Sequence, residues 1–178
     1  MYVSSLRSSY LQTERERLRS ETTLNFLLDL FKLSDPAINL GDSLSVGFYL
    51  KEGIAKAEEI ADGNTRAAIY NTIGNVYSSM GEPDRAYAFL NKALDLQTSG
   101  AVENKNRASY LMDLGAVARS NMDYKTGIRY LRSALGVTVD PVLKMKASTD
   151  LAIIYDKLDT DSADYYRTIS LKVSNDPS

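Results

Sequence analysis

Histidine and cysteine are both absent from the 178-residue sequence. Without histidine, the chain lacks the commonest general base and the commonest transition-metal ligand, and every catalytic triad built on imidazole is excluded. Without cysteine, it has no disulfide framework, no thiol nucleophile and no zinc–thiolate site. We therefore expect a protein that is not an enzyme and that uses no metal or other cofactor.

Basic charge and long apolar runs are also missing. The formal net charge is −2, which gives no basic footprint for nucleic acid. The twelve tyrosines could stack on bases, but helical spacing favours a place in the core for Tyr70 and Tyr77. The most apolar stretch, Leu24–Leu33, is shorter than the roughly 20 residues that span a bilayer. We expect a soluble chain without a signal peptide and without direct membrane insertion.

Glycine and proline are few, ten and four, and most of them separate segments of helical periodicity. Strand-like alternation is nearly absent, which predicts an all-α fold. A long helix is expected over residues 11–33 and a second helix over residues 44–61, with Asp62-Gly63-Asn64 as the turn that ends it. The pair Asp159 and Asp161 lacks the ligand pattern of a calcium loop and is expected to form a turn with a helix cap.

The sequence repeats itself at a spacing of 41 residues. Gly74 maps onto Gly115 and Leu90 onto Leu131, with no gap. Each unit contains two amphipathic helices, A and B, and a weaker third unit starts 37 residues after the second. The expected organisation is an N-terminal long helix (1–38), a degenerate first repeat (39–66), full units at 67–107 and 108–144, and a degenerate unit at 145–178.

Apolar and small residues predict how the two helices of a unit pack. Helix A of the first full unit is expected to pack through Ile69, Ile73, Val76 and Met80, and helix B through Ala86, Phe89, Leu90, Ala93 and Leu94. Glycine inside a helix costs about 0.5–1 kcal/mol relative to alanine, so Gly74 and Gly115 indicate close helix–helix approach. On this packing, Gly74→Leu should destabilise the fold by on the order of 1–3 kcal/mol.

The segment Tyr70–Leu96 resembles the tetratricopeptide repeat. The signature residues of the two units are Tyr70, Gly74, Tyr77, Ala86, Leu90, Ala93, Leu114, Gly115, Gly127, Leu131 and Ala134. The period exceeds the family's 34 residues by about two helical turns, as in long-helix variants, whereas HEAT-like repeats lack this signature. The resemblance implies a right-handed superhelical α-solenoid of antiparallel helix pairs that binds a peptide or partner domain on a concave face lined by helix A.

A second resemblance covers Arg17–Val46. This stretch is similar to the segment that precedes the repeats in bacterial membrane-anchored serine/threonine protein kinases, through Phe26-Leu27, Leu30-Phe31, Ser34-Asp35-Pro36 and Gly41. None of the kinase's own motifs occurs in the chain. The resemblance implies a sensor or docking part of a bacterial signalling protein, on the cytoplasmic or the extracytoplasmic side of a membrane.

Residues of helix A that lie off the packing stripe are the candidate partner-binding residues: Asn71, Asn75, Ser78, Met112, Ala116, Arg119, Thr149, Ile153 and Asp156. Asn71 and Asn75 are one helical turn apart, so their amides could read an extended peptide backbone. Simple solvation of these helix positions is the alternative. A rival function is self-assembly through the terminal helices, because Ile169, Leu171 and Val173 have no evident capping helix.

Overall fold

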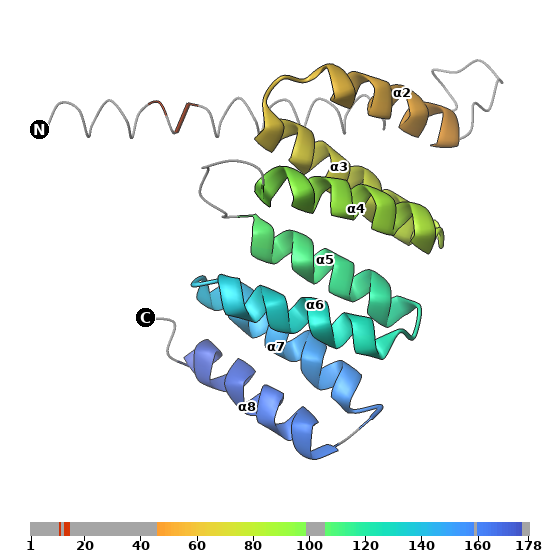
Figure 1. The fold of residues 1–178 in the computed structure, drawn as a ribbon. Coiled ribbons are helices and arrows are strands. Elements are labelled where there is room, and N and C mark those ends of the chain that lie inside the picture. Colours follow the sequence, from red (N-terminus) through yellow and green to blue (C-terminus); the bar gives the residue numbers. More distant parts are fainter. Residues whose placement is uncertain (1–10, 12, 15–45, 99–105, 159, 176–178) are drawn as a thin grey trace, which may run out of the picture. The chain divides into compact units, whose positions relative to one another are not determined.

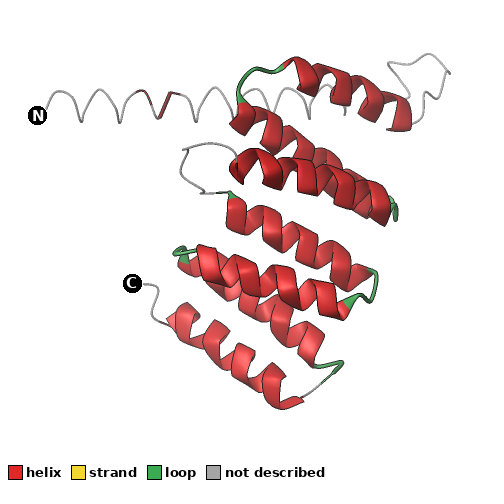
Figure 2. Cartoon of the chain, viewed as in Figure 1, coloured by secondary structure: helices red, strands yellow, loops and turns green. Residues whose placement is uncertain are grey.

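A computed structural model of the chain describes residues 11, 13–14, 46–98, 106–158 and 160–175 (Figure 1). All regular secondary structure in this part of the chain is helical (Figure 2). The helices are α2 (Val46–Glu59), α3 (Gly63–Ser79), α4 (Pro83–Thr98), α5 (Arg107–Ser120), α6 (Tyr124–Val137), α7 (Pro141–Tyr155) and α8 (Thr160–Asn175). The expected N-terminal helix over residues 1–38 lies outside the described residues, apart from 11, 13 and 14.

The chain divides into two compact units, Met1–Tyr70 and Asn71–Ser178. In the first unit, Leu50 and Ala57 of α2 are buried. The helix bounds also agree closely with the expected 44–61.

The predicted turn at Asp62-Gly63-Asn64 is wrong in its extent, because α3 already begins at Gly63. The Asp62 carboxylate accepts hydrogen bonds from the backbone N–H of Thr65 at 2.7 Å and from its hydroxyl at 2.6 Å. A carboxylate that satisfies a free N–H of the first turn is a helix N-cap, so these residues start a helix instead of only ending one.

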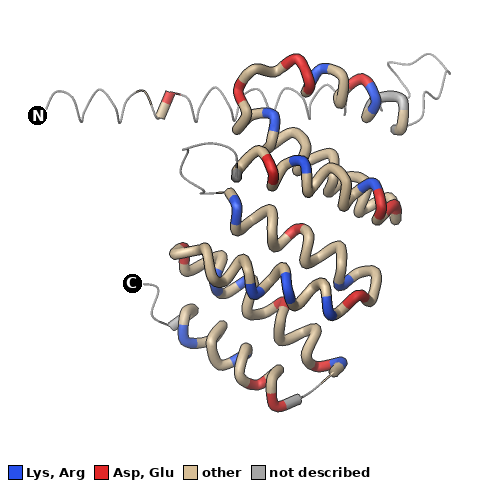
Figure 3. Tube along the Cα trace, viewed as in Figure 1, with Lys and Arg blue, Asp and Glu red and all other residues tan. Residues whose placement is uncertain are grey.

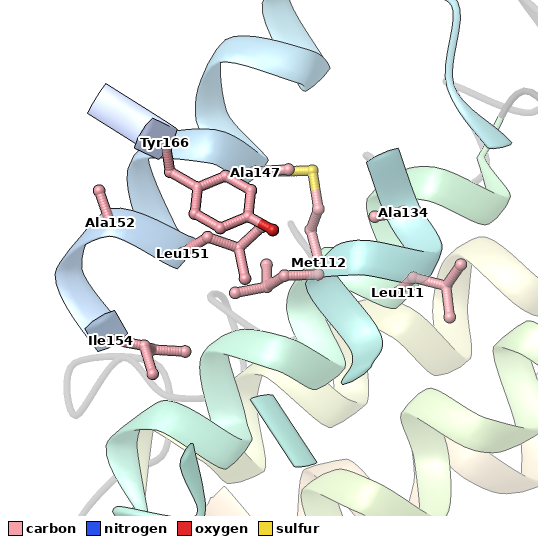
Figure 4. Packing of buried hydrophobic residues seen from close by; sticks show 9 residues of the cluster. Leu111, Met112, Ala134, Ala147, Leu151, Ala152, Ile154 and Tyr166 are labelled. Atoms are coloured by element: carbon pink, nitrogen blue, oxygen red, sulfur yellow. The ribbon is translucent and has the colours of Figure 1, made fainter. Parts of the chain in front are cut away.

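The second unit is built from helix A and helix B in alternation. Helix A is the part of α3 from Asn71 onward, then α5 and α7, and helix B is α4, α6 and α8. Helix α5 packs against α4, α6 and α7, and α7 also packs against α6 and α8. A core cluster of this unit contains Leu111, Met112, Leu131, Ala134, Ala147, Leu151, Ala152, Ile154 and Tyr166 (Figure 4).

Two glycines let helix B approach helix A closely. A Cβ placed on Gly74 would lie 2.7 Å from Cγ of Leu90 and 3.2 Å from the carbonyl oxygen of Ala86. A Cβ on Gly115 would lie 2.8 Å from Cγ of Leu131 in the same way. Both leucines are fully buried, so each fills the space that a side chain on the glycine would need. The close approach predicted from the repeated glycines is confirmed.

The turns between helix A and helix B also repeat. The N–H of Glu82 donates to the carbonyl of Tyr77 at 2.9 Å, and 41 residues later the N–H of Asp123 donates to the carbonyl of Ala118 at 2.9 Å. Gly81 has a φ of 73°, and the equivalent residue Met122 has a φ of 59°. The second turn therefore keeps a left-handed conformation that only glycine adopts without strain.

Some predicted core residues lie at the edge of the core. Met80 follows the last residue of α3 and is 43% exposed, so its expected place on the packing stripe is wrong. Ile169 of α8, expected on the outer face, instead packs against the core cluster. Pro83 occupies the first position of α4, which suits proline because the position needs no N–H donor.

Candidate functional site

The candidate site is the face that helix A of successive repeats presents, called here the A face and defined by Asn71, Asn75, Asp113, Arg119 and Asp150. The amides of Asn71 and Asn75 both donate to Oδ2 of Asp113 on α5, at 2.9 and 3.3 Å. The next helix A continues the pattern, since Arg119 of α5 forms an ion pair with Asp150 of α7 at 3.7 Å. The A helices thus lie side by side, joined by polar contacts.

The two aspartates occupy equivalent positions in their repeats. Asp113 and Asp150 are 37 residues apart, which is also the spacing of Gly115 and Ala152. Burial raises the pKa of Asp113, although the hydrogen bonds from Asn71 and Asn75 oppose the shift. Burial likewise raises the pKa of Asp150, opposed by the charge of Arg119. Each carboxylate is therefore held in a partly desolvated seam between neighbouring A helices.

The structure places the two predicted asparagines on the A face but engages their amide N–H groups within the chain. Both donate to the same carboxylate oxygen, and both side chains are only partly exposed. A ligand that used these donors would have to compete with Asp113. The asparagines therefore have a structural role, because they hold α5 against α3, in addition to any role in binding a ligand.

Met112 is not available on this face. It is 9% exposed and belongs to the core cluster, where its side chain extends toward Ala147 of α7 (Figure 4). The reason is that α7 packs on α5 and covers the position that corresponds to Asn71. Sequence spacing shows which residues share one face of a helix, but it does not show which side chains of the next repeat pack against that face.

The remaining candidate residues lie at different depths. Ser78 and Ala116 are partly exposed, and Ile153 is exposed. The hydroxyl of Thr149 is within 2.9 Å of the carbonyl of Met145 and of the hydroxyl of Ser170, so it bridges α7 to α8. Asp156 forms an ion pair with Arg167 of α8. Thr149 and Asp156 are exposed but engaged with helix B, and Ala116 and Ile153 occupy equivalent positions of α5 and α7.

The predicted structural residues are buried. The side chains that are at most 6% exposed include Tyr70, Tyr77, Ala86, Leu90, Ala93, Leu114, Leu131 and Ala134. Gly127 is also buried, and a Cβ on it would lie 3.0 Å from Cδ1 of Ile154. Gly127 thus provides room for the third helix A, a contact that its place in the second unit did not reveal.

Sequence reasoning missed Asp113 and Asp150. A signal was present in each case, because a carboxylate stands between the apolar Met112 and Leu114 in α5, and another directly precedes the apolar run Leu151–Ile154 in α7. A charged residue at such a position needs a partner when the helix packs. Within the described residues, no group of three His, Cys, Asp or Glu could hold a metal ion.

Comparison with known protein families shows that part of this face belongs to a recognised repeat. Residues 67–99 match the tetratricopeptide repeat family. The matched repeat contains Gly74 and Leu90 and both asparagines of the A face. No curated protein matches the sequence.

Solved structures with tetratricopeptide-like folds are similar to the chain in three dimensions. One is the crystal structure of the APC/C hetero-tetramer Cut9–Hcn1, with a TM-score of 0.63 at 21% identity, covering 86% of this chain and 27% of that one. Another is BtubC (BKLC) from P. vanneervenii, with a TM-score of 0.63 at 17% identity, covering 91% of this chain and 75% of that one. The chain spans about a quarter of the length of the first. The predicted all-α helical-repeat fold is confirmed, and the tetratricopeptide resemblance is confirmed for residues 67–99.

The described helices are not of the kind that crosses a bilayer, since none is both long enough and apolar enough.

Proposed function

We propose that the chain is a non-catalytic interaction module that binds a peptide segment of a protein partner along the A face. The observation that carries the proposal is the direct contact of successive A helices through Asn71, Asn75 and Asp113 and through Arg119 and Asp150. Because of these contacts, equivalent positions of α3, α5 and α7 form one continuous surface. Packed helices are about 8–10 Å apart, so an extended segment of about six residues would cross all three.

The chemistry of this face fits a ligand of mixed character. Arg119 and Asp150 supply one charge of each sign, and Ile153 adds an exposed apolar side chain on α7. Tetratricopeptide arrays use the same helix for binding, which agrees with the match at residues 67–99. The simple alternative is that these positions are only solvated, and an experiment must separate the two.

The obvious test, replacing Asn71 and Asn75 by alanine, is unsuitable. It would remove both donors to the partly buried Asp113, and an unsatisfied buried group costs about 1–3 kcal/mol. Loss of binding could then reflect loss of the fold. A better variant adds bulk to the face without removing a contact of the interior.

Ala116→Arg is such a variant, since Ala116 is partly exposed in the middle of α5. Peptides selected from a random display library on the wild-type chain should bind this variant at least about tenfold more weakly, which corresponds to about 1.4 kcal/mol. The matched control is Ala88→Arg, at an exposed position of helix B in α4, which should bind as the wild type does. Equal binding by both variants would remove the A face from the proposal.

We also infer, from the resemblance of Arg17–Val46, that the module is a docking or sensor part of a larger bacterial regulatory protein. Most of that segment lies outside the described residues. Immunoblotting of the native host with an antibody to the chain should detect a protein well above 19.7 kDa. A single band at 19.7 kDa would contradict the inference.

Self-assembly is the second candidate function. Tyr165 and Leu171 of α8 are 62% and 63% exposed, so this helix has apolar surface that another copy could cover. However, Ile169 is turned toward the core, which leaves less of this surface than the sequence suggested. Sedimentation velocity of the wild type and of Leu171→Lys would decide, because self-assembly predicts a concentration-dependent shift that the variant loses.

A further inference from the structure

Arg132 of α6 is held by two tyrosine hydroxyls from two other helices. Its Nε donates to the hydroxyl oxygen of Tyr166 on α8 at 3.1 Å, and its Nη2 donates to that of Tyr155 at the end of α7 at 2.9 Å. These two nitrogens form one edge of the planar guanidinium. The edge formed by Nη1 and the second N–H of Nη2 has no hydrogen bond within the described part of the chain, and the residue is exposed.

The tyrosines that hold Arg132 are themselves fixed. The rings of Tyr155 and Tyr166 are stacked, with centroids 5.4 Å apart and planes 10° apart, and Tyr165 packs edge-on against Tyr166 at 5.1 Å. Tyr166 is only 8% exposed. An arginine normally loses rotamer freedom when it binds a ligand, and here much of that freedom is already lost in the free chain. The guanidinium is thus oriented in advance, with an open edge that fits two acceptor oxygens.

The two hydroxyls add donors of their own. Each tyrosine oxygen accepts a hydrogen bond from Arg132, so its own proton is free to point toward a second acceptor. Both hydroxyls lie on the Nε–Nη2 edge, however, so their main effect is to fix the orientation of Arg132 while its other edge is left for an anion.

The surrounding surface of α6 is basic. Lys125, Arg129 and Arg132 recur at i, i+4 and i+7, all are exposed, and α6 contains no Asp or Glu (Figure 3). At 1.5 Å per residue the three cations extend over about 10 Å of helix. The N-cap Asp123 is a nearby carboxylate. Hydrogen bonds from Thr126 are the main cause of its lowered pKa, and the charges of Arg129 and Lys125 lower it further. One carboxylate beside three cations leaves the local charge positive in a chain whose net charge is −2.

A neighbouring arginine, Arg167, differs from Arg132 because its charge is compensated within the chain. Arg167 of α8 forms ion pairs with both Asp156 and Asp164, which neutralise it within the chain. Arg132 has no ion pair among the described residues and is held by neutral groups: the hydroxyls of Tyr155 and Tyr166, and the ring of Tyr155, whose centroid lies 5.9 Å from Cζ of Arg132. The contrast shows that Arg132 is ordered without its charge being compensated.

We propose that this surface of α6, Lys125, Arg129 and Arg132 with Tyr155 and Tyr166, binds an acidic Asp/Glu-rich segment of a partner protein, with one carboxylate seated on the open edge of Arg132. Cations spread along about 10 Å suit successive carboxylates of an extended segment better than one concentrated phosphate. A nucleic acid is disfavoured because three cations are few and the faces of Tyr155 and Tyr166 stack on each other instead of being open to bases. The cations of this site all belong to helix B, and the site does not depend on the A face.

The test is fluorescence polarisation of the full chain with a labelled peptide of alternating Glu and Ser, about ten residues long, at low and moderate salt. The wild type should bind it, and affinity should fall as salt rises. Arg132→Lys keeps the charge but loses the planar fork, so affinity should drop about five- to tenfold. The double variant Tyr155→Phe, Tyr166→Phe keeps both rings and removes both hydroxyls, and it should weaken binding to a similar extent.

The matched control is Arg167→Lys, which makes the same substitution at an arginine already paired and should leave binding unchanged. Circular dichroism of each variant verifies the helical fold before binding is measured. The proposal is overturned if a Gln-for-Glu peptide binds equally well, or if Arg132→Lys binds as the wild type does. Tighter binding of a phosphopeptide or of single-stranded DNA of equal charge would also overturn it, because the partner would then belong to a different chemical class.

Discussion

We expect Gly74→Ala to destabilise the fold, although alanine is normally the better helix residue. The change gains about 0.5–1 kcal/mol of helix propensity. Against this, the new Cβ would lie 2.7 Å from Cγ and 2.9 Å from Cδ2 of Leu90, which is fully buried and cannot turn away. Overpacking of a dense core costs about 1–3 kcal/mol. The net expectation is a free energy of unfolding about 1 kcal/mol lower than that of the wild type, and at most about 2.5 kcal/mol lower.

The assay is urea denaturation followed by far-ultraviolet circular dichroism, with Gly136→Ala as the matched control. Gly136 is also in a helix, but nothing lies within 4 Å of the place that an added methyl group would occupy, so the propensity gain should appear alone. In a thermal scan, Gly74→Ala should lower the Tm and Gly136→Ala should raise it, by about 2–4 °C per kcal/mol.

A double-mutant cycle with Leu90→Ala identifies the cause. Once Leu90 is truncated, the methyl of Gly74→Ala has room, and the substitution should become neutral or stabilising. The reasoning is refuted if Gly74→Ala raises stability as Gly136→Ala does, or if its cost is the same with and without the Leu90 side chain.

Two further predictions concern the second repeat. Met122 holds the left-handed φ of 59° where the preceding turn has Gly81, so Met122→Gly should raise the free energy of unfolding by up to about 1 kcal/mol in urea, and a loss would contradict the strain. Burial raises the pKa of Asp113, so the folded chain keeps this proton to a higher pH than the unfolded chain, and the wild type loses stability as pH rises through the raised pKa. Asp113→Asn keeps an acceptor for Asn71 and Asn75, so its stability relative to wild type should increase as pH rises above the unfolded-state pKa of about 4, whereas a difference constant with pH would exclude this origin.

Much of the fold could be predicted from the sequence because the determinants of pairing are local and repeated. Gly74 and Leu90 recur 41 residues later as Gly115 and Leu131, and the structure uses both pairs in the same way. Where prediction failed, the cause lay in single side chains. The carboxylate of Asp62 turned an expected helix end into a helix start, a capping contact that the composition of the turn did not reveal.

The A face was harder to predict than the core. Spacing identified which residues share a helix face, but Met112 is covered by α7, and the amides of Asn71 and Asn75 are engaged by Asp113. Both facts depend on which residue the next repeat brings opposite, tens of residues away in the sequence. The hydrogen bonds that hold Arg132 could not be predicted for the same reason, because Tyr155 and Tyr166 come from two later helices.

The polar seam between A helices bears on how the second unit deforms. Within a pair, Leu90 fits against Gly74 so tightly that the two helices cannot slide or separate without leaving a void. Between neighbouring A helices, the bonds from Asn71 and Asn75 to Asp113 are of a kind that water can replace at a net cost of about 1 kcal/mol each. The core cluster, in contrast, is shared by α5, α6, α7 and α8 and joins the second helix pair to the third. Bending should therefore concentrate between α3 and α5, so that this part of the A face widens or narrows to follow the thickness of a bound ligand.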